Sequence, residues 1–315
     1  MNPWEGQRGV AVEALHQLVS NHSEYAVRYL PEICRSVRDT HPYVRVSAAG
    51  VCCGLARWNI DSAVELFVSS CDHPDDRVLS GLYVPHFLSR TWSRFPKSIE
   101  PLLRRMIDSA NSDVAECGAY WATAGSVAKG LYVDLADTCC RGNVSQRTGV
   151  AGALVDLART DEHRDAALQL LPQYFSDPDE SVSNKAAHIF HRNSELLALP
   201  VGPSLALEFA NSQAFHRDPS DLLMPLNRYA GSLLPFAEVM TAVVTAAAGP
   251  LASLIGDIQT RHAMVSSALP DVLLRLYQEA DGVGNTAIRN VCLDAWDRLL
   301  EAQIVGLDTL SAIDS

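Results

Sequence analysis

Two histidines three residues apart, His188 and His191, are the pair whose type and spacing best suit metal binding. On a helix this spacing puts both imidazoles on one face, and imidazole nitrogen is a common zinc ligand. A zinc site needs at least a third protein ligand, and no residue at a suitable spacing supplies one. The sequence therefore predicts no metal site and no cofactor, and the histidines are interpreted as part of a polar helix face.

Paired carboxylates are the other groups that could do chemistry, at Asp75-Asp76, Asp161-Glu162 and Asp179-Glu180. They fall at predicted turns or helix starts, where acidic groups favour the helix dipole. General acid–base catalysis needs a partly dry pocket, which nothing in the sequence marks. The chain also contains no Walker A, Gly-x-Ser-x-Gly, His-Glu-x-x-His or Gly-x-Gly-x-x-Gly motif. We therefore predict no catalytic residue and a protein that is not an enzyme.

The elements that position these residues are set by a repeated pair of small or compact residues. Offsets of three, four and seven from each pair are mostly apolar, which traces one stripe of an α-helix. Spacings of 37, 32, 38, 30 and 38 residues indicate stacked helical hairpins. The sequence thus predicts an all-α fold, an α-solenoid, from the pairs Ala11-Val12, Ala48-Ala49, Ser80-Gly81, Gly118-Ala119, Thr148-Gly149 and Ala186-Ala187.

A shorter amphipathic helix is predicted before most of these helices, at 25–38, 61–71, 98–109, 131–140 and 165–175. The turns between them hold Asp39-Thr-His-Pro42, Asp72-His-Pro74, Asn111-Ser-Asp113 and Asp177-Pro178. Proline suits the first helical position and Asp, Asn or Ser supplies capping oxygens. An arginine also recurs three residues before the small pair in three copies, as Arg8, Arg45 and Arg77. This pattern, over roughly residues 5–195, resembles a HEAT repeat, a resemblance that concerns fold.

The period loosens after residue 199, so we expect HEAT-like hairpins over 1–199 and an irregular continuation over 200–315. In the last predicted helix, Cys292-Leu293 takes the place of the small pair, with Ala295, Trp296 and Leu299 at the apolar offsets. The predicted helices of this region are 204–211, 220–230, 233–248, 250–262, 271–280 and 285–302.

The amino-acid composition limits which partners and which cellular compartment are expected. The formal net charge is −12, and the excess of acidic residues lies after residue 110, which argues against a nucleic-acid partner. The eight cysteines have no metal or disulfide spacing, so a reducing cytoplasm is expected. No secretory signal is visible. The uncharged stretch 239–256 is interpreted as a buried helix pair with no membrane role.

Three classes of function stay open. The first is a protein-interaction or ligand-sensing scaffold with a protein partner. The second is a HEAT-like nucleic-acid enzyme similar to the alkylpurine DNA glycosylases, which would need a basic groove. The third is a HEAT-type lyase like the phycobiliprotein chromophore lyases, for which no residue signature is present. The first is preferred, because neither a basic groove nor a catalytic motif is found.

A narrower resemblance concerns the tail. Leu233-Leu-Pro-Phe-Ala-Glu-Val and Ile288-Arg-Asn-Val-Cys-Leu-Asp-Ala-Trp-Asp-Arg-Leu-Leu300 resemble the C-terminal end of bacterial STAND-type P-loop ATPases. In that family a helical-repeat arm senses a ligand and releases an oligomerising ATPase, which would make this chain a sensor arm. Solenoids need a polar cap, and the chain opens almost directly on a repeat. We therefore expect either part of a larger multidomain protein or a first face that docks something.

The candidate partner-binding residues are those whose offsets from the small pair place them outside the predicted core face. Tyr83, Phe87, Trp121 and Trp296 fall on the core stripe, whereas His86 and Tyr120 do not. These two residues are therefore interpreted either as interface anchors or as partly buried contacts between repeats. Basic residues also gather with Trp92 and Phe95 around one predicted loop. It is interpreted as a solvated loop with a half-buried aromatic, an anion or nucleic-acid contact being the alternative. The basic residues of this cluster are Arg90, Arg94, Lys97, Arg104 and Arg105. The candidate surface therefore consists of His86, Arg90, Trp92, Arg94, Tyr120, His188 and His191.

Overall fold

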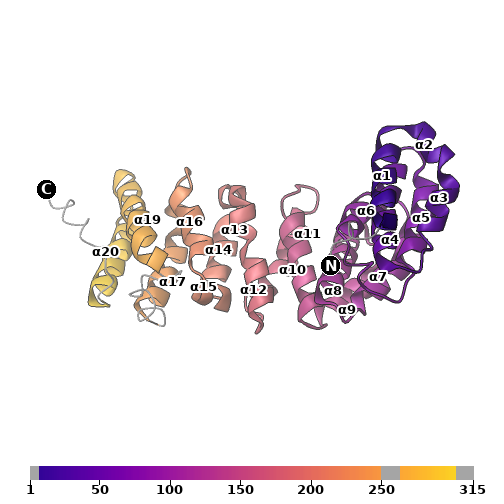
Figure 1. Cartoon of the computed structure of the whole chain (residues 1–315). Helices are drawn as coiled ribbons and strands as arrows, with labels where there is room; N and C mark the ends of the chain where they lie inside the picture. Colours follow the sequence, from indigo (N-terminus) through magenta and orange to yellow (C-terminus); the bar gives the residue numbers. More distant parts are fainter. Residues whose placement is uncertain (1–6, 250–262, 303–315) are drawn as a thin grey trace. The chain divides into compact units, whose positions relative to one another are not determined.

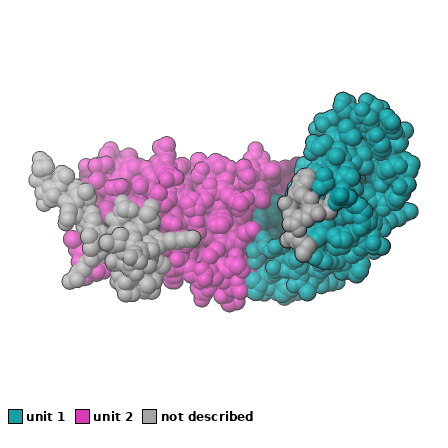
Figure 2. Space-filling view, viewed as in Figure 1, with its two compact units in different colours: residues 1–153 teal, residues 154–315 magenta. Residues whose placement is uncertain are grey.

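The computed structural model describes residues 7–249 and 263–302, and within them it contains helices and no β-strand. The chain divides into two compact units, residues 1–153 and 154–315 (Figures 1 and 2). Each unit is described below by itself. The all-α prediction is therefore confirmed for the described residues. The superhelical stacking, the HEAT assignment and the boundary at residue 199 stay predictions.

Unit 1 consists of helices that each pack on the next ones along the chain. Helix α1 packs on α4, α4 on α5 and α6, α5 on α7, and α7 on α8. Neighbouring helical hairpins would make contacts in this order. The bounds are α1 Gln7–Asn21, α2 Ser23–Arg28, α3 Leu30–Ser36, α4 Pro42–Leu55, α5 Ile60–Cys71, α6 Tyr83–Thr91, α7 Pro96–Ile107, α8 Ser112–Lys129, α9 Val133–Cys140 and α10 Val144–Leu157, which runs on into unit 2.

Unit 2 combines several short helices with the longer α19 and α20, and a cluster of phenylalanines lies in its core. The ring of Phe209 lies 5.2 Å from that of Phe175 and 5.4 Å from that of Phe190, both edge-on. Helix α16 packs on α19, and α17 packs on α14 and α20. The bounds are α11 Arg164–Leu170, η2 Leu171–Tyr174, α12 Glu180–Ala187, α13 Ile189–Arg192, η3 Ser194–Ala198, α14 Gly202–Ala210, α15 Gln213–Arg217, α16 Ser220–Arg228, η4 Leu234–Phe236, α17 Ala237–Ala248, α19 Ala263–Gly282 and α20 Thr286–Glu301.

The small residues of the repeat lie where two helix backbones come close together. A Cβ on Gly118 of α8 would lie 2.8 Å from the Cβ of Met106 and 2.9 Å from the backbone nitrogen of Ile107, both in α7. A Cβ on Gly149 of α10 would collide with the carbonyl oxygen of Glu116 in α8. Small side chains therefore permit the close approach of these helices, as the register predicts.

The register is wrong in two copies. In α1 the small residue Ala11 is exposed and Gly9, Glu13 and Val19 are buried instead, so a different face of that helix meets the core. Glu13 is buried because its carboxylate accepts a hydrogen bond from the Tyr83 hydroxyl at 3.0 Å, a contact between residues far apart in sequence.

In the third copy, Ser80-Gly81 lies in the turn before α6 and not in a helix. Leu293, the second residue of the pair in the seventh copy, is also exposed, at 43%. The seventh copy holds otherwise, because Cys292, Ala295, Trp296 and Leu299 of α20 are buried.

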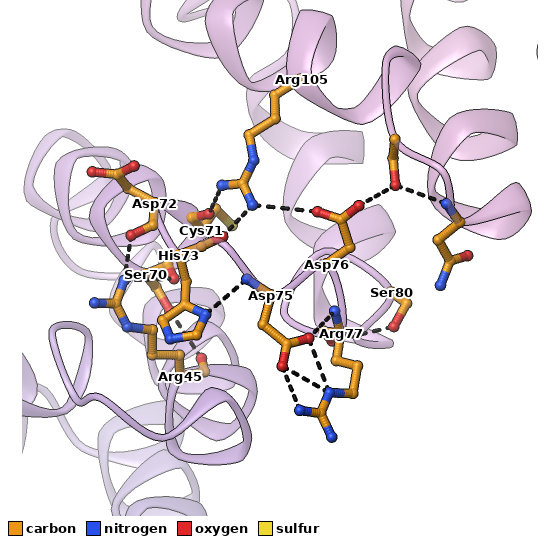
Figure 3. A network of polar contacts seen from close by, with 12 residues as sticks. Arg45, Ser70, Cys71, Asp72, His73, Asp75, Asp76, Arg77, Ser80 and Arg105 are labelled. Atoms are coloured by element: carbon orange, nitrogen blue, oxygen red, sulfur yellow. Dashed lines mark hydrogen bonds and ion pairs between the residues drawn. The ribbon is translucent and has the colours of Figure 1, made fainter.

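Two arginines complete the C-terminal end of α5 (Figure 3). Arg45 of α4 donates a hydrogen bond to the carbonyl oxygen of Ser69 at 3.0 Å. It also donates one to the carbonyl oxygen of Asp72 at 2.7 Å. Arg105 of α7 donates to the carbonyl oxygen of Cys71 at 2.5 Å. The last carbonyls of an α-helix have no partner within the helix, so these guanidinium groups satisfy them. The recurring arginine Arg45 thus joins adjacent helices.

The carboxylates Asp75 and Asp76 belong to the same network (Figure 3). Asp75 accepts hydrogen bonds from Arg77, which lower the pKa of Asp75 to about 2. Asp76 lies 3.4 Å from the guanidinium of Arg105 and accepts a hydrogen bond from the Ser109 hydroxyl. Both groups therefore hold the turn between α5 and α6, in keeping with their interpretation as turn and capping residues.

Candidate functional site

An open pocket in unit 1 is formed by one face of α8 together with Pro85 of α6. The helix begins after Asn111, whose side chain accepts hydrogen bonds from the backbone nitrogens of Asp113 at 3.0 Å and Val114 at 3.4 Å. Spacings of three, four, seven and eight residues share a helix face. From α8 that face contributes Asp113, Glu116, Cys117, Tyr120 and Trp121, and the pocket volume is about 490 Å³.

The base of this pocket is aromatic. The rings of Tyr120 and Trp121 lie 5.1 Å apart and meet edge-on, at 78°. Both side chains are half-buried, so each leaves part of its ring accessible. Trp121 was expected in the core, three residues after Gly118, and that expectation is wrong. Trp121 instead lies beside the buried residues of α8, such as Gly118 and Ala122, on the side of the helix that forms the pocket.

The thiol in this pocket is not a nucleophile. Burial, reinforced by the charge of Glu116, raises the pKa of Cys117 to about 12, against a hydrogen bond from Trp121 that lowers it. The thiolate is the reactive form of cysteine, so at neutral pH this group is inert. The pocket therefore offers surfaces for binding and no thiolate for catalysis.

Two carboxylates give the pocket its charge. Asp113 is exposed and Glu116 is half-buried, one turn apart on the same helix face as the aromatic rings. Aromatic faces attract cations, and a carboxylate forms charge-assisted hydrogen bonds with them. The arrangement is thus suited to a side chain that is apolar along its length and cationic at its end.

The remaining predicted residues of unit 1 lie on α6 and the turn that follows it. His86 is exposed and directly follows Pro85 of the pocket. Arg90 is exposed, and its charge lowers the pKa of the Cys53 thiol against a larger increase from burial.

Trp92, at the end of α6, is half-buried, and its carbonyl accepts a hydrogen bond from the Tyr132 hydroxyl at 2.5 Å. The guanidinium of Arg94 lies 5.2 Å from the centre of the Phe95 ring. The structure thus shows a solvated turn with a half-buried aromatic, the interpretation preferred from the sequence.

The two histidines lie in unit 2, where the single predicted helix is divided. His188 separates α12 from α13, and His191 lies within α13. Partial burial of the His188 ring lowers its pKa, and the nearby charges of Arg192, His191 and Lys185 lower it further. The Nε2 atom of His191 lies 3.0 Å from the Oδ1 atom of Asp221 in α16. His191 also lines a second cavity.

Metal-ligand geometry is not found around these histidines. Across residues 7–249 and 263–302 no group of three or more His, Cys, Asp or Glu side chains is arranged to hold a metal ion. Asp179 caps α12, accepting hydrogen bonds from the backbone nitrogen of Ser181 at 3.0 Å and from its hydroxyl at 2.6 Å. Asp161 pairs with Arg164 at 2.6 Å.

The uncharged stretch 239–256 is described only as far as residue 249. Its first part belongs to α17, whose Val239, Val243 and Val244 are buried. The predicted helix 250–262 lies outside the described residues. No helix in the described ranges combines the length and apolar character needed to cross a bilayer.

Comparisons with known proteins give no assignment. No protein-family model matches the chain, and a search of curated protein sequences finds no relative. Any function must therefore be argued from the pocket and its residues.

Of the six residues of this pocket, the sequence identified one. Tyr120 was identified because it lies off the core register, while Asp113, Glu116 and Cys117 were not considered together. Their spacing could have indicated the pocket, since these three residues recur at helical intervals and lie next to the core face of the same helix. The contribution of Pro85 depends on tertiary packing and has no local signal.

Proposed function

We propose that this protein is a non-catalytic interaction or ligand-sensing scaffold of HEAT-like helical hairpins. We further propose that the pocket formed by Pro85 and α8 receives a basic side chain of a protein partner. The observation that carries this proposal is a pocket with two accessible aromatic rings, two carboxylates and a protonated thiol on one helix face.

The pocket chemistry favours arginine or lysine on the partner. The carbon chain of either residue can lie against Trp121 and Tyr120, and its charge can approach Asp113 or Glu116. Aromatic anchors contribute most of the energy in protein interfaces. The acidic net charge of −12 would also speed the encounter with a basic partner.

The nucleic-acid alternative has no support from this pocket. Phosphate groups are bound by cations, whereas the charged residues of the pocket are carboxylates. Of the predicted basic cluster, Arg104 pairs with Glu100 at 3.1 Å and Arg105 is used in capping α5. DNA binding that weakens steeply with salt would nevertheless replace the present proposal.

The proposal is tested with short acetylated peptides that carry arginine, lysine, citrulline or norleucine at one central position. Binding to the full chain is measured by fluorescence polarisation across a library of flanking residues. We expect arginine and lysine peptides to bind at least about tenfold tighter than citrulline and norleucine ones, because charge-assisted contacts are lost in the neutral peptides. Equal binding of citrulline peptides, or none by any peptide, would contradict the proposal.

Two variants locate the binding to the pocket. Asp113→Asn combined with Glu116→Gln should abolish the preference for the charged peptide, and Trp121→Leu should weaken all peptides. Glu65→Gln, at an exposed carboxylate of α5 outside the pocket, is the matched control and should bind as the parent does.

The narrower assignment, a sensor arm of a STAND-type ATPase, remains a proposal that rests on the resemblance of the tail. The gene region around this chain tests it directly. A P-loop ATPase encoded in the same reading frame, or in a neighbouring gene, would support it.

A further inference from the structure

Unit 2 contains a second cavity, which the proposed function does not use. It has a volume of about 410 Å³ and lies between α13 with η3 on one side and the end of α16 with the segment after it on the other. Its apolar residues include Phe190, Leu197 and Pro225. Cavities of roughly 300–1,000 Å³ that are mostly apolar with a few polar groups are typical of small-molecule sites.

The walls of this cavity are fixed to each other. The contact of the His191 Nε2 atom with the Oδ1 atom of Asp221, at 3.0 Å, joins α13 to the start of α16, and the two helices pack together. Tyr229, which follows α16, meets the ring of Phe236 edge-on at 5.8 Å. The ring of Tyr229 also lies against Gly231, where a Cβ would be only 2.8 Å from its Cε1 atom.

The segment after α16 is tied to α19 as well. Arg275 donates a hydrogen bond to the carbonyl oxygen of Gly231 at 2.8 Å. The carboxylate of Glu279 accepts hydrogen bonds from the Ser232 hydroxyl and the Leu233 backbone nitrogen, both at 2.8 Å. These contacts place one wall before any ligand arrives, which reduces the ordering cost of binding.

Two opposite charges line this cavity without pairing. Arg228 ends α16 and Glu195 lies in η3, and both are exposed. Neither makes an ion pair or a side-chain hydrogen bond with any residue in the described ranges. A guanidinium recognises a carboxylate through two parallel hydrogen bonds, and a carboxylate recognises an ammonium group. The cavity thus presents one site for each end of a zwitterion, beside an apolar surface.

We propose that this cavity binds a free α-amino acid with an apolar side chain. Arg228 would hold the carboxylate of the ligand, Glu195 its ammonium group, and Ala198, Tyr229 and Ala230 its side chain. A phosphate or another simple anion would use Arg228 alone and would bring negative charge towards Glu195. A zwitterion is the chemistry that satisfies both groups.

The experiment uses the full chain and L-phenylalanine, with the other apolar amino acids in parallel. Isothermal titration calorimetry measures each, together with 3-phenylpropionate, which lacks the ammonium group, and phenethylamine, which lacks the carboxylate. We expect saturable binding of at least one amino acid, and at least about tenfold weaker binding of its two analogues. No saturable binding by any amino acid, or binding of an analogue as tight as that of its parent, would overturn the proposal.

Variants assign the two ends of the ligand. Arg228→Gln should weaken the amino acid and 3-phenylpropionate but not phenethylamine, and Glu195→Gln should weaken the amino acid and phenethylamine but not 3-phenylpropionate. Arg192→Gln and Glu208→Gln, at exposed charges outside the cavity, are the matched controls. Binding that neither cavity variant changes would place the ligand elsewhere and reject the site.

The result is independent of the peptide pocket in unit 1. The Asp113→Asn, Glu116→Gln double variant should bind the amino acid as the parent does. A failure here therefore leaves the proposed peptide contact untouched, and a failure of that contact leaves this site untouched.

Discussion

The two units of the chain form their recesses in different ways. In unit 1 the pocket is one face of the long helix α8 together with Pro85, so five of its six residues share one helical spacing. In unit 2 the cavity is assembled from the short helices α13 and η3, the end of α16 and the segment after it. A single regular helix thus supplies most of the first recess, whereas several interrupted segments supply the second.

The side-chain hydrogen bonds that join segments also differ between the two units. In unit 1, arginines such as Arg45 and Arg105 satisfy the exposed end of a helix and so hold helices together. In unit 2, Arg275 and Glu279 instead hold a non-helical segment, the one that carries a wall of the cavity. The contacts that hold this segment of unit 2 therefore also position a wall of its cavity.

The largest loss of stability that tests this difference is expected from a substitution at the close contact between α7 and α8 in unit 1. Gly118→Leu would force its side chain against the Cβ of Met106 and the backbone of Ile107. Overpacking of this kind costs about 1–3 kcal/mol, and backbone contact favours the upper end. Thermal and urea unfolding of the variant measure the loss.

The control for that variant is a glycine with open space around it. A Cβ on Gly282, at the end of α19, would meet nothing within 4 Å. Gly282→Ala should therefore leave stability unchanged within about 0.5 kcal/mol. If Gly118→Leu unfolded at the parent's midpoint, the close packing of α7 and α8 would be wrong.

A smaller loss of stability should follow from removing one of the arginines that bind the carbonyl oxygens at the end of α5. Arg45→Met leaves the carbonyl oxygens of Ser69 and Asp72 without their charged donor. Hydrogen bonds to charged groups contribute about 1.5–3 kcal/mol, and these are partly exposed, so we expect a loss near the lower value. Urea unfolding checks it.

Arg77→Met is the matched comparison, since Arg77 occupies the same place in the repeat. Its guanidinium pairs with Asp75 at the surface, where ion pairs add little stability. Equal losses from the two variants would show that the repeat position and not the carbonyl contacts matters.

These variants also show what the sequence could and could not predict. The predicted helices 61–71 and 285–302 match α5 and α20 within one residue at each end, because apolar periodicity and turn residues are local signals. Asn111 was recognised as a capping residue for the same reason, and it caps α8. The all-α class followed directly from such signals.

Failures of prediction came from contacts between residues distant in sequence. The face of α1 that is buried depends on Tyr83, whose hydroxyl holds the carboxylate of Glu13. The helix predicted through the histidines is interrupted at His188, where packing in unit 2 replaces one long helix by two short ones. The pocket of unit 1 needed Pro85, and the cavity of unit 2 needed Arg228 and Tyr229, which no repeat pattern brings together.

The smallest expected effect concerns the pH dependence of unit 2. Since partial burial and neighbouring cations lower the pKa of His188 in the folded state, the unfolded chain binds its proton more readily. Its contribution to stability is therefore complete above the unfolded pKa of about 6.5 and is lost as the pH falls towards the folded value. His188→Gln should remove this contribution, so its urea midpoint should decline less between pH 7.5 and 5.5 than that of the parent. A decline in His188→Gln as steep as in the parent would mean that the cationic group around His188, with Lys185, His191 and Arg192, does not oppose its protonation.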